Sequence, residues 1–332
     1  MLMKNTIKRI SVFVLLNVSL AQAVLVTVQL DAFAVLAGRD LKVSGQVTVN
    51  GSVAALGDIF LAGGASLYGD AYSDGRIRVG RESFVQGRLI SSGSMSLSNF
   101  TETGSLDSSQ CLRIGAGSVV HGHVAYAGEY LVSPSAVIEG SVSTSPDSWQ
   151  LLPVGIPGFS EVVGDSLKYG QGVSETITPG SYDSLSAAAG ATLYLTAGSY
   201  NFNSVKLGSD VKVIADTTAG EVNIICGGKF TTSGNVIFED LIDGGFNVYS
   251  GGNMSLGLNN NLAARLSCYS NMNVARDTYI NGSVYSSGDI HLGARVVIDN
   301  NEYAESIAMV PEPASIALLT GSLLWVARRR KC

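Results

Sequence analysis

Residues 40–93 divide into three consecutive lines of equal length, 40–57, 58–75 and 76–93, which read "DLKVSGQVTVNGSVAALG", "DIFLAGGASLYGDAYSDG" and "RIRVGRESFVQGRLISSG". No gap is needed to place similar residues in the same column. A fixed period of this kind is the signature of a repeat architecture, so it decides the fold before any local pattern does. The apolar columns contain Leu41, Ile59 and Ile77; Val43, Leu61 and Val79; and Val49, Leu67 and Val85. The glycine columns contain Gly51, Gly69 and Gly87, and Gly57, Gly75 and Gly93.

The period extends well beyond this stretch. The first column continues at Met95, and after a slip of one residue the pattern resumes at Leu112. In the C-terminal half Met254, Met272 and Ile290 recur at the same spacing. That spacing also places Gly180 over Gly198 and Tyr182 over Tyr200, and an insertion at "EDLIDGG" lengthens one step, which runs from Asn223 to Asn247.

Within each line the apolar residues alternate with polar ones, which is the period of a β-strand. The runs are short and are bounded by Gly, Ser, Asn and Asp, which form turns. Short strands with a long fixed period predict an all-β, single-stranded β-solenoid with coils of about 18 residues and three strands per coil. Columns of Leu, Ile and Val should stack inside, and glycine should occupy corners where a positive φ is needed.

The period divides the chain into two halves. We expect a capping strand in residues 24–39, about six coils in 40–145, about seven coils in 177–301 and a linker in 302–310. At roughly 4.8 Å per coil the whole rod would be on the order of 60 Å long. Residues 146–176 contain Pro146, Pro153 and Pro157 and break the period. They are either a loop excursion from one solenoid, which we favour, or a joint between two rods.

The N-terminus has the organisation of a secretory signal. Lys4, Lys8 and Arg9 precede the apolar run "ISVFVLLNVSLA", and Ala21 and Ala23 form an A-x-A cleavage site. We therefore predict a signal helix in residues 1–23 that is removed on export. Two alternatives remain open, namely a second A-x-A site further along in "LDAFA" and an uncleaved anchor helix.

The C-terminus has three parts in residues 311–332. Pro311, Glu312 and Pro313 form a breaker, an apolar segment at 314–327 follows, and the chain closes on bases and a cysteine. The apolar segment is short for a membrane span, which needs about 20 residues. The four bases are Arg328, Arg329, Arg330 and Lys331, placed where cytoplasmic bases hold a segment in the membrane.

This order resembles the PEP-CTERM sorting signal of Gram-negative bacteria. The resemblance implies that an exosortase in the inner membrane recognises Pro311, Glu312 and Pro313 and removes the short transmembrane helix and basic tail. It also implies export across the inner membrane, with the body at the cell surface or outside the cell after processing. An unprocessed tail anchor is the alternative.

The repeat itself resembles the bactofilin-type right-handed β-helix, and the later half is similar to β-helix domains of bacterial surface proteins. Handedness is implied by this resemblance alone. Seven of the 21 bases lie in the two ends, so the body is more acidic than the net charge of −6 suggests. An acidic body argues against nucleic acid and anionic lipid as partners.

Cysteine and histidine give little support to a reactive or metal site. Cys226 and Cys268 share a column two coils apart, about 9.6 Å, which is too far for a disulfide. They, like Cys111, are interpreted as structural residues. His121 and His123 lie on one side of a strand but lack an evident third ligand, because His291 is distant in sequence.

The carboxylates offer two weak candidates for an active site. Asp40 and Asp58 share a column with Arg76, which predicts a surface ion ladder rather than a catalytic pair. Glu239, Asp240 and Asp243 are the best groove candidate, in the coil lengthened by the "EDLIDGG" insertion. No P-loop, nucleophile elbow or zinc motif is present in the sequence. We therefore expect no catalytic residues, no metal and no cofactor.

The outward-facing residues of the predicted strands indicate which ligands the surface of the solenoid could bind. One outward column reads Lys42, Phe60, Arg78 and Ser96, and another reads Thr48, Ser66 and Phe84. There is no threonine stripe of the kind on which some solenoids bind ice, so ice binding is not favoured.

The preferred hypothesis is an exported structural solenoid of the cell surface or biofilm matrix, associated with exopolysaccharide. The alternatives are a carbohydrate-binding or carbohydrate-active β-helix protein and end-to-end self-assembly, the latter weakened by the expected cap.

Overall fold

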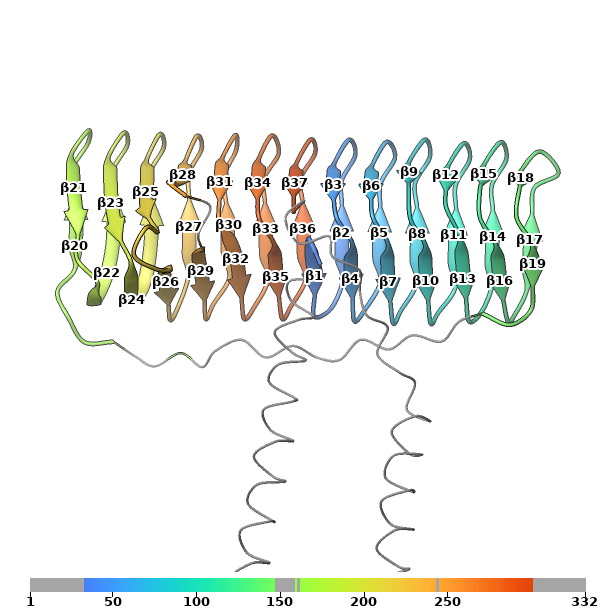
Figure 1. The fold of residues 1–332 in the computed structure, drawn as a ribbon, viewed down its shortest axis with the longest axis horizontal. Helices are drawn as coiled ribbons and strands as arrows, with labels where there is room; N and C mark the ends of the chain where they lie inside the picture. The colour runs from blue at the N-terminus through green and yellow to red at the C-terminus, as the bar shows by residue number, and fades with distance from the viewer. Residues whose placement is uncertain (1–32, 147–158, 160–161, 243–244, 301–332) are drawn as a thin grey trace, which may run out of the picture.

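The computed structural model describes residues 33–146, 159, 162–242 and 245–300. This part of the chain contains 37 strands and no helix, and every strand pairing in it is parallel. The strands stack as the coils of one solenoid (Figure 1). The prediction of an all-β solenoid is thus confirmed, whereas the expected signal helix and C-terminal transmembrane helix lie outside the described residues.

Each coil contributes one strand to each of three faces. Face 1 contains, in order along the rod, the first parts of β22 (Gly180–Ala187) and β24 (Gly198–Leu207), then β26 (Val222–Cys226), β29 (Phe246–Ser250), β32 (Arg265–Cys268), β35 (Val284–Ser286), β1 (Val35–Ala37), β4 (Val53–Ala55), β7 (Ala71–Ser73), β10 (Leu89–Ser91), β13 (Leu106–Ser108), β16 (Val124–Tyr126) and β19 (Val142–Ser143).

Face 2 contains β20 (Leu167–Tyr169), the second parts of β22 and β24, then β27 (Phe230–Thr232), β30 (Met254–Leu256), β33 (Met272–Val274), β36 (Ile290–Leu292), β2 (Leu41–Val43), β5 (Ile59–Leu61), β8 (Ile77–Val79), β11 (Met95–Leu97), β14 (Leu112–Ile114) and β17 (Tyr130–Val132).

Face 3 is a separate sheet of 13 strands: β21 (Ser174–Ile177), β23 (Thr192–Thr196), β25 (Lys212–Asp216), β28 (Ile237–Asp240), β31 (Asn261–Ala263), β34 (Tyr279–Asn281), β37 (Val297–Asp299), β3 (Thr48–Asn50), β6 (Ser66–Tyr68), β9 (Phe84–Val85), β12 (Glu102–Thr103), β15 (Val119–Val120) and β18 (Val137–Ile138).

The order of the coils along the rod differs from their order in the chain. The first coil lies in the middle, because β1 pairs with β4 on one side and with β35 on the other. In the same way β2 lies between β5 and β36, and β3 between β6 and β37. The chain therefore runs from the middle to the end at β19, continues at the opposite end at β20, and returns to the middle at β37 (Figure 1).

This order corrects two boundaries expected from the sequence. Residues 35–37 do not belong to a cap; they form an interior strand, and Val35 precedes its partner Val53 by one full period of the repeat. The segment 146–176, expected to be a loop excursion or a joint, contains β20 and the first three residues of β21, so the second half of the solenoid begins before residue 177. The rod ends are therefore formed by β17–β19 and β20–β21, neither of which is a chain terminus.

The core consists of the predicted apolar columns. Leu41, Ile59 and Ile77 are register partners on successive coils, and all three are fully buried. Burying a side chain of this size stabilises the fold by about 1.5–3 kcal/mol relative to leaving it exposed. Because one coil cannot bury its own apolar face, that stabilisation is obtained only when coils stack.

Coil length varies where the sequence departs from the common period. Met95 pairs with Leu112, one residue short of that period, as the slip predicts, and Asn223 pairs with Asn247 across the predicted longer step. The proposed match of Tyr182 with Tyr200 was wrong, because Tyr182 pairs with Phe202, two residues further along. A shift of two residues keeps every side chain on the same face, so alternation in the sequence does not detect it.

The turn between faces 2 and 3 contains a residue of positive φ in nearly every coil. Gln46 has φ 61°, and Gly64 on the next coil has φ 74°. Most glycines of the two predicted columns are instead required by close stacking, because a Cβ there would collide with the adjacent coil. A Cβ on Gly69 would lie 2.5 Å from the carbonyl carbon of Gly51 on the adjacent coil. The residues of this positive-φ column are Gly172, Gly190, Asp210, Asn235, Asn259, Asp277, Arg295, Gln46, Gly64, Glu82, Phe100 and Gly117.

Candidate functional site

One column of outward side chains runs along face 2 for the length of the rod. Its residues are the centres of the face 2 strands and their equivalents in β22 and β24. In rod order they are Lys168, Ser186, Lys206, Thr231, Ser255, Asn273, His291, Lys42, Phe60, Arg78, Ser96, Arg113 and Leu131. We call this set the basic column, because it holds five Lys or Arg residues and no acid. It contains the predicted column from Lys42 to Ser96, whose register is confirmed.

The bases of this column lack ion-pair partners among the described residues. Seven other bases of the body do have acidic partners. Six make no ion pair within the described chain, and all six belong to or adjoin face 2. Five of them, Lys42, Arg78, Arg113, Lys168 and Lys206, are exposed residues of the basic column. The sixth is Lys229, two residues before Thr231 and hence on the same side of the sheet.

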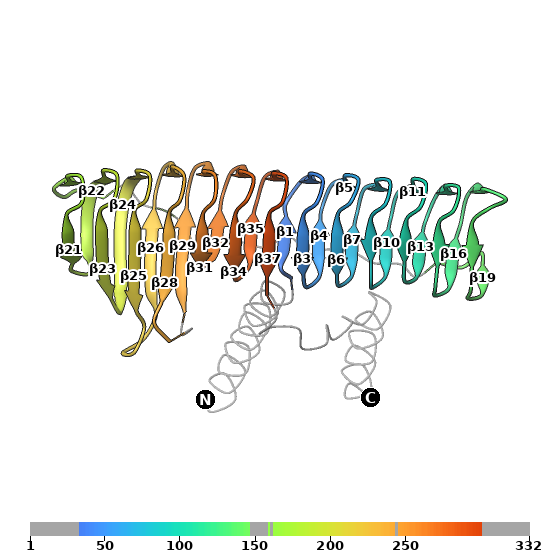
Figure 2. The same ribbon diagram turned by 90° about the horizontal axis from the view of Figure 1, so that it is seen from above.

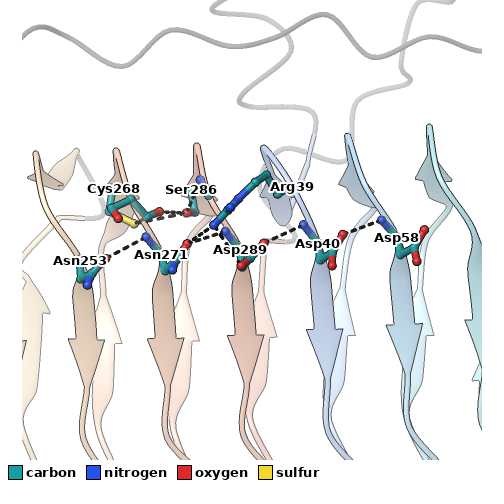
Figure 3. Close-up of polar contacts among 10 residues, drawn as sticks. Arg39, Asp40, Asp58, Asn253, Cys268, Asn271, Ser286 and Asp289 are labelled. Atoms are coloured by element: carbon teal, nitrogen blue, oxygen red, sulfur yellow. Dashed lines mark hydrogen bonds and ion pairs between the residues drawn. The ribbon is translucent and has the colours of Figure 1, made fainter.

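A ladder of short polar side chains runs beside the basic column across the middle of the rod (Figure 3). We call it the polar ladder; it contains Asn253, Asn271, Asp289, Asp40 and Asp58. In the first four, Oδ1 accepts a hydrogen bond from the backbone N–H of the next rung at 3.0 to 3.2 Å, and Asp58 Oδ1 accepts from the Arg76 N–H at 2.8 Å. The bond from the Asp40 N–H to Asp289 joins the last coil of the chain to the first. The ladder therefore stabilises the contact between the two chain halves.

The ladder carboxylates are largely neutralised by arginine. Arg39 contacts Asp289 at 3.1 Å, and Arg76 contacts Asp58 at 2.6 Å. The hydrogen bond from Arg76 lowers the pKa of Asp58. The predicted surface ion ladder is thus confirmed, and Asp40 and Asp58 are occupied by structural hydrogen bonds rather than arranged as an acid–base pair.

The other flank of the basic column carries no large side chain. The residue two positions after each column residue is Gly, Ala or Ser in all thirteen cases. Close stacking explains this composition, since a Cβ on Gly80 would lie 2.5 Å from the backbone nitrogen of Gly63. These small residues form a continuous strip of surface beside the bases, and none of them has a long side chain. Its residues are Gly170, Ala188, Gly208, Ser233, Gly257, Ala275, Gly293, Ser44, Ala62, Gly80, Ser98, Gly115 and Ser133.

The two ends of the described chain lie side by side in the middle of the rod (Figures 1 and 2). The Ala34 N–H donates to Ser52 O, and the Asn300 N–H donates to Asn50 O, so both ends leave from the same corner between faces 3 and 1. Face 2 does not include this corner.

Face 1 carries outward apolar residues that are nonetheless buried. Leu36, Tyr72, Ile90 and Tyr285 alternate with core residues along their strands and form a second apolar cluster with exposed fractions of 4 to 7%. These outward side chains of face 1 are therefore buried over the middle of the rod, whereas the bases of the basic column on face 2 are exposed.

The described carboxylates of the coil lengthened by "EDLIDGG" make hydrogen bonds and an ion pair that stabilise this coil. Asp240 accepts hydrogen bonds from the Thr217 hydroxyl and from the Gly245 N–H, the latter at 3.1 Å. Glu239 contacts Lys212 at 2.7 Å on face 3. Asp243 lies outside the described residues. Nothing in these contacts brings two carboxylates together over a groove.

The histidines have separate surroundings. His121 lies between Glu102 and Glu139 at 2.9 and 2.8 Å, and these hydrogen bonds raise its pKa. His123 contacts Asp107, a buried carboxylate that also binds Arg88. In the described part of the chain no group of three or more His, Cys, Asp or Glu is placed to hold a metal ion.

The cysteines occupy the positions that the repeat predicts. One column of face 1 contains the successive register partners Cys226, Ser250, Cys268 and Ser286. The two cysteines therefore lie two coils apart, with Ser250 on the coil between them. Cys226 and Cys268 are buried, and burial raises the pKa of Cys226 to about 11. Cys268 donates to Ser270 O at 3.3 Å. Its Sγ also lies 3.5 Å from the Ser286 hydroxyl (Figure 3). These are properties of unreactive core thiols.

The residues predicted for export and sorting lie outside the described part of the chain. They are Ala21, Ala23, Pro311, Glu312, Pro313, Arg328, Arg329, Arg330 and Lys331. Among the described residues, no helix is long and apolar enough to cross a membrane.

Comparisons with known proteins identify no family. No family model matches the chain, and no curated protein matches it. Among solved structures, a crystal structure of an ice-binding protein from an Antarctic biological consortium is 10% identical, with 83% of this chain and 92% of that chain covered and a TM-score of 0.37. A crystal structure of an ice-binding protein from an Antarctic Flavobacteriaceae bacterium is 11% identical, with coverages of 81% and 96% and a TM-score of 0.28. At these TM-scores the likeness carries no conclusion about this chain.

Sequence reasoning found the start of the basic column but missed its extent. Lys42 and Arg78 were placed in one column by the period of the repeat. Lys168 and Lys206 belong to the same column only through the longer coil between β22 and β24 and through the contact of β36 with β2. Reading the outward positions of every coil, once the register is known, is the signal that reveals the column.

Proposed function

We propose that this protein is an exported structural solenoid that an exosortase sorts to the cell surface, where it associates with extracellular polysaccharide. The proposal combines the three-part C-terminal sequence with the placement of the chain ends. Because residues 33 and 300 leave the rod at one corner near its middle, anything attached to them holds the rod at its centre. Until the tail is removed, a rod held in this way extends along the membrane instead of standing up from it.

The placement of the ends is the observation that carries the proposal. A signal at the N-terminus and a membrane segment at the C-terminus would both attach at the same corner, between faces 3 and 1. Face 2 would remain free for a partner in the matrix. A stiff, repetitive body with an uncovered face fits a scaffold, and it offers many equal coils to a repetitive polymer.

A carbohydrate-active enzyme on the same scaffold is the alternative. It requires clustered carboxylates over a groove. The carboxylates singled out from the sequence, Asp40, Asp58, Glu239 and Asp240, are instead engaged by backbone N–H groups, hydroxyls or bases. Polysaccharide binding without turnover is therefore the function that the arrangement supports best.

The test is the fate of the tail in a bacterium that has an exosortase. The full chain and a variant with Pro311→Ala, Glu312→Ala and Pro313→Ala would be expressed there, and the exported proteins analysed by intact mass spectrometry. We expect the parent protein to lose its C-terminal segment and reach the surface, and the variant to keep the segment in the inner membrane fraction. A mature parent protein that still ends in Lys331 and Cys332 would contradict the proposal.

A further inference from the structure

We propose that the basic column of face 2 binds a linear anionic polysaccharide whose carboxylates are spaced by about one disaccharide. The inference names the partner class of the proposed function and rests on that function for the compartment in which the polymer is met. The charge and spacing of the column are independent of how the protein is sorted.

The bases form two groups, separated by the five steps from Lys206 to Lys42, and within each group they recur at alternate coils. Lys42, Arg78 and Arg113 are separated by two inter-strand steps each, and so are Lys168 and Lys206. Two steps amount to about 9.6 Å. An extended disaccharide has a similar length, so a polymer with one carboxylate per disaccharide can place each carboxylate beside one base.

The residues between the bases favour a sugar chain. Phe60, which is 45% exposed, lies between Lys42 and Arg78 and offers an aromatic surface for a sugar ring. Ser186 lies between Lys168 and Lys206, and Ser96 lies between Arg78 and Arg113; their hydroxyls can donate to or accept from sugar hydroxyls. The longer gap between Lys206 and Lys42 holds the polar residues Thr231, Ser255, Asn273 and His291. The strip of Gly, Ala and Ser leaves room for the polymer to lie alongside the column.

The absence of ion pairs makes these bases available. A base that already holds a carboxylate must lose that contact before it binds another. Lys42, Arg78 and Arg113 make no ion pair with a described residue, in a body where seven other bases do. Binding an external carboxylate therefore breaks no ion pair of the described chain.

Charge density separates this partner from nucleic acid. A nucleic acid strand carries one phosphate per about 3.4 Å, roughly three for each base of the column. The carboxylate of Asp40, which makes no ion pair with a described base, lies two residues from the column and would repel such a dense polyanion. A polysaccharide with one carboxylate per disaccharide can place its charges beside the bases and leave uncharged segments beside the acidic side chains.

The experiment measures binding of the purified full-length protein, kept in a mild detergent, to four probes by isothermal titration calorimetry. The probes are hyaluronan oligosaccharides, with one carboxylate per disaccharide; polygalacturonate fragments, with one on every sugar; neutral dextran; and single-stranded DNA. We expect the tightest binding to hyaluronan, weakened by salt because the contacts are exposed charges, and no binding to dextran. Equal binding of dextran, or tighter binding of polygalacturonate or DNA, would overturn the proposal.

Matched charge variants locate the surface. Lys42→Gln, Arg78→Gln and Arg113→Gln combined should weaken hyaluronan binding about tenfold, as expected for three exposed ion pairs. The control combines Lys212→Gln, Arg276→Gln and Arg295→Gln, which removes the same charge outside the column, and it should change the affinity less than about twofold. A control that loses as much as the column variant would mean that net charge, not the column, governs binding.

The two proposals fail separately. If the tail is processed but the column variant binds hyaluronan like the parent, the inference fails and the proposed function stands. If Lys331 persists in the mature protein while the column variant loses binding, the inference stands and the sorting proposal fails. Circular dichroism checks that the variants remain folded. The column variant changes exposed residues without ion pairs in the described chain. The control variant removes the surface ion pairs of Lys212, Arg276 and Arg295, which contribute little to stability.

Discussion

The residue of positive φ in each turn shows how the repeat tolerates side chains at positions suited to glycine. In the left-handed region a Cβ costs about 1–2 kcal/mol per residue. The solenoid accepts this cost at Gln46, Glu82 and Phe100, while Gly64 and Gly117 avoid it on neighbouring coils. The sequence could predict a corner here but not its conformation, because Gln and Phe give no signal of a positive φ.

Reciprocal substitutions test this column. Gly64→Ala should lower the free energy of unfolding by about 1 kcal/mol through backbone strain, since the nearest atom to a new Cβ is 3.8 Å away and no clash arises. Gln46→Gly, on the adjacent coil, should raise it by about 0.5 kcal/mol, the relief of strain being partly offset by the entropy of glycine. Urea unfolding followed by circular dichroism measures both. Changes of the same sign in the two variants would contradict the conformational explanation.

His121 provides the clearest pH dependence at a single residue. Hydrogen bonds to the carboxylates of Glu139 and Glu102 raise its pKa above the usual value of about 6.5. A group whose pKa is higher in the folded state contributes stability that is complete below its unfolded pKa and is lost as pH rises through its folded pKa. The contribution should therefore fade as pH rises from about 6.5.

The measurement is an NMR titration of the His121 ring, assigned with a His121→Gln variant. We expect a pKa above about 6.5 in the parent protein and a lower pKa in Glu139→Gln, which removes the negative charge but keeps a polar side chain. A pKa that is the same in both proteins would rule out the ion pair as its cause.

The contact between the last coil and the first is the element on which the continuous rod depends. It combines parallel pairing on all three faces with the polar ladder. The ladder is one-directional, because each side chain accepts from the next backbone N–H in the same direction along the rod. Removing one acceptor should therefore leave one partly buried N–H unsatisfied, at a cost of about 1 kcal/mol.

Asp40 allows this to be tested with a close control. Asp40→Ala removes the acceptor of the Asp58 N–H and should lower the urea midpoint, whereas Asp40→Asn keeps an Oδ1 acceptor and should remain near the parent value. Asn271, which makes the same contact as a neutral residue elsewhere in the ladder, supports the second expectation. If the Asn variant is as destabilised as the Ala variant, charge rather than the hydrogen bond determines the stability of this contact.

The elements themselves were predictable because two periods are superimposed in the sequence. Alternation assigns each residue to a face, and the longer period assigns each strand to a neighbour, so the contacts of Leu41 with Ile59 and of Met254 with Met272 follow directly. The longer coil between β22 and β24 did not follow, since a shift of two preserves alternation. The position of β1 could have been found, because "VLA" at 35–37 lies one period before "VAA" at 53–55.

For the whole molecule, the sequence could not predict which coils adjoin at the middle. Every coil presents the same kind of apolar edge, so the edge formed by Leu41 and Val43 can stack on Ile290 and Leu292 as well as it stacks on Ile59 and Leu61. Local patterns predict that coils stack, whereas tertiary structure determines their order. Both proposals depend on that order, because it places the chain ends at the middle and makes the basic column continuous.

The most direct test is a distance across the whole rod. Leu131 and Lys168, both exposed, close the basic column at its two ends, twelve inter-strand steps apart. Cysteine substitutions at these positions, with Cys111 and Cys332 replaced by serine, would carry spin labels for double electron–electron resonance. Twelve steps of about 4.8 Å predict a separation of roughly 58 Å. A solenoid whose coils stacked in chain order would bring residues 131 and 168 onto neighbouring coils, and a distance below about 20 Å would contradict the fold described above.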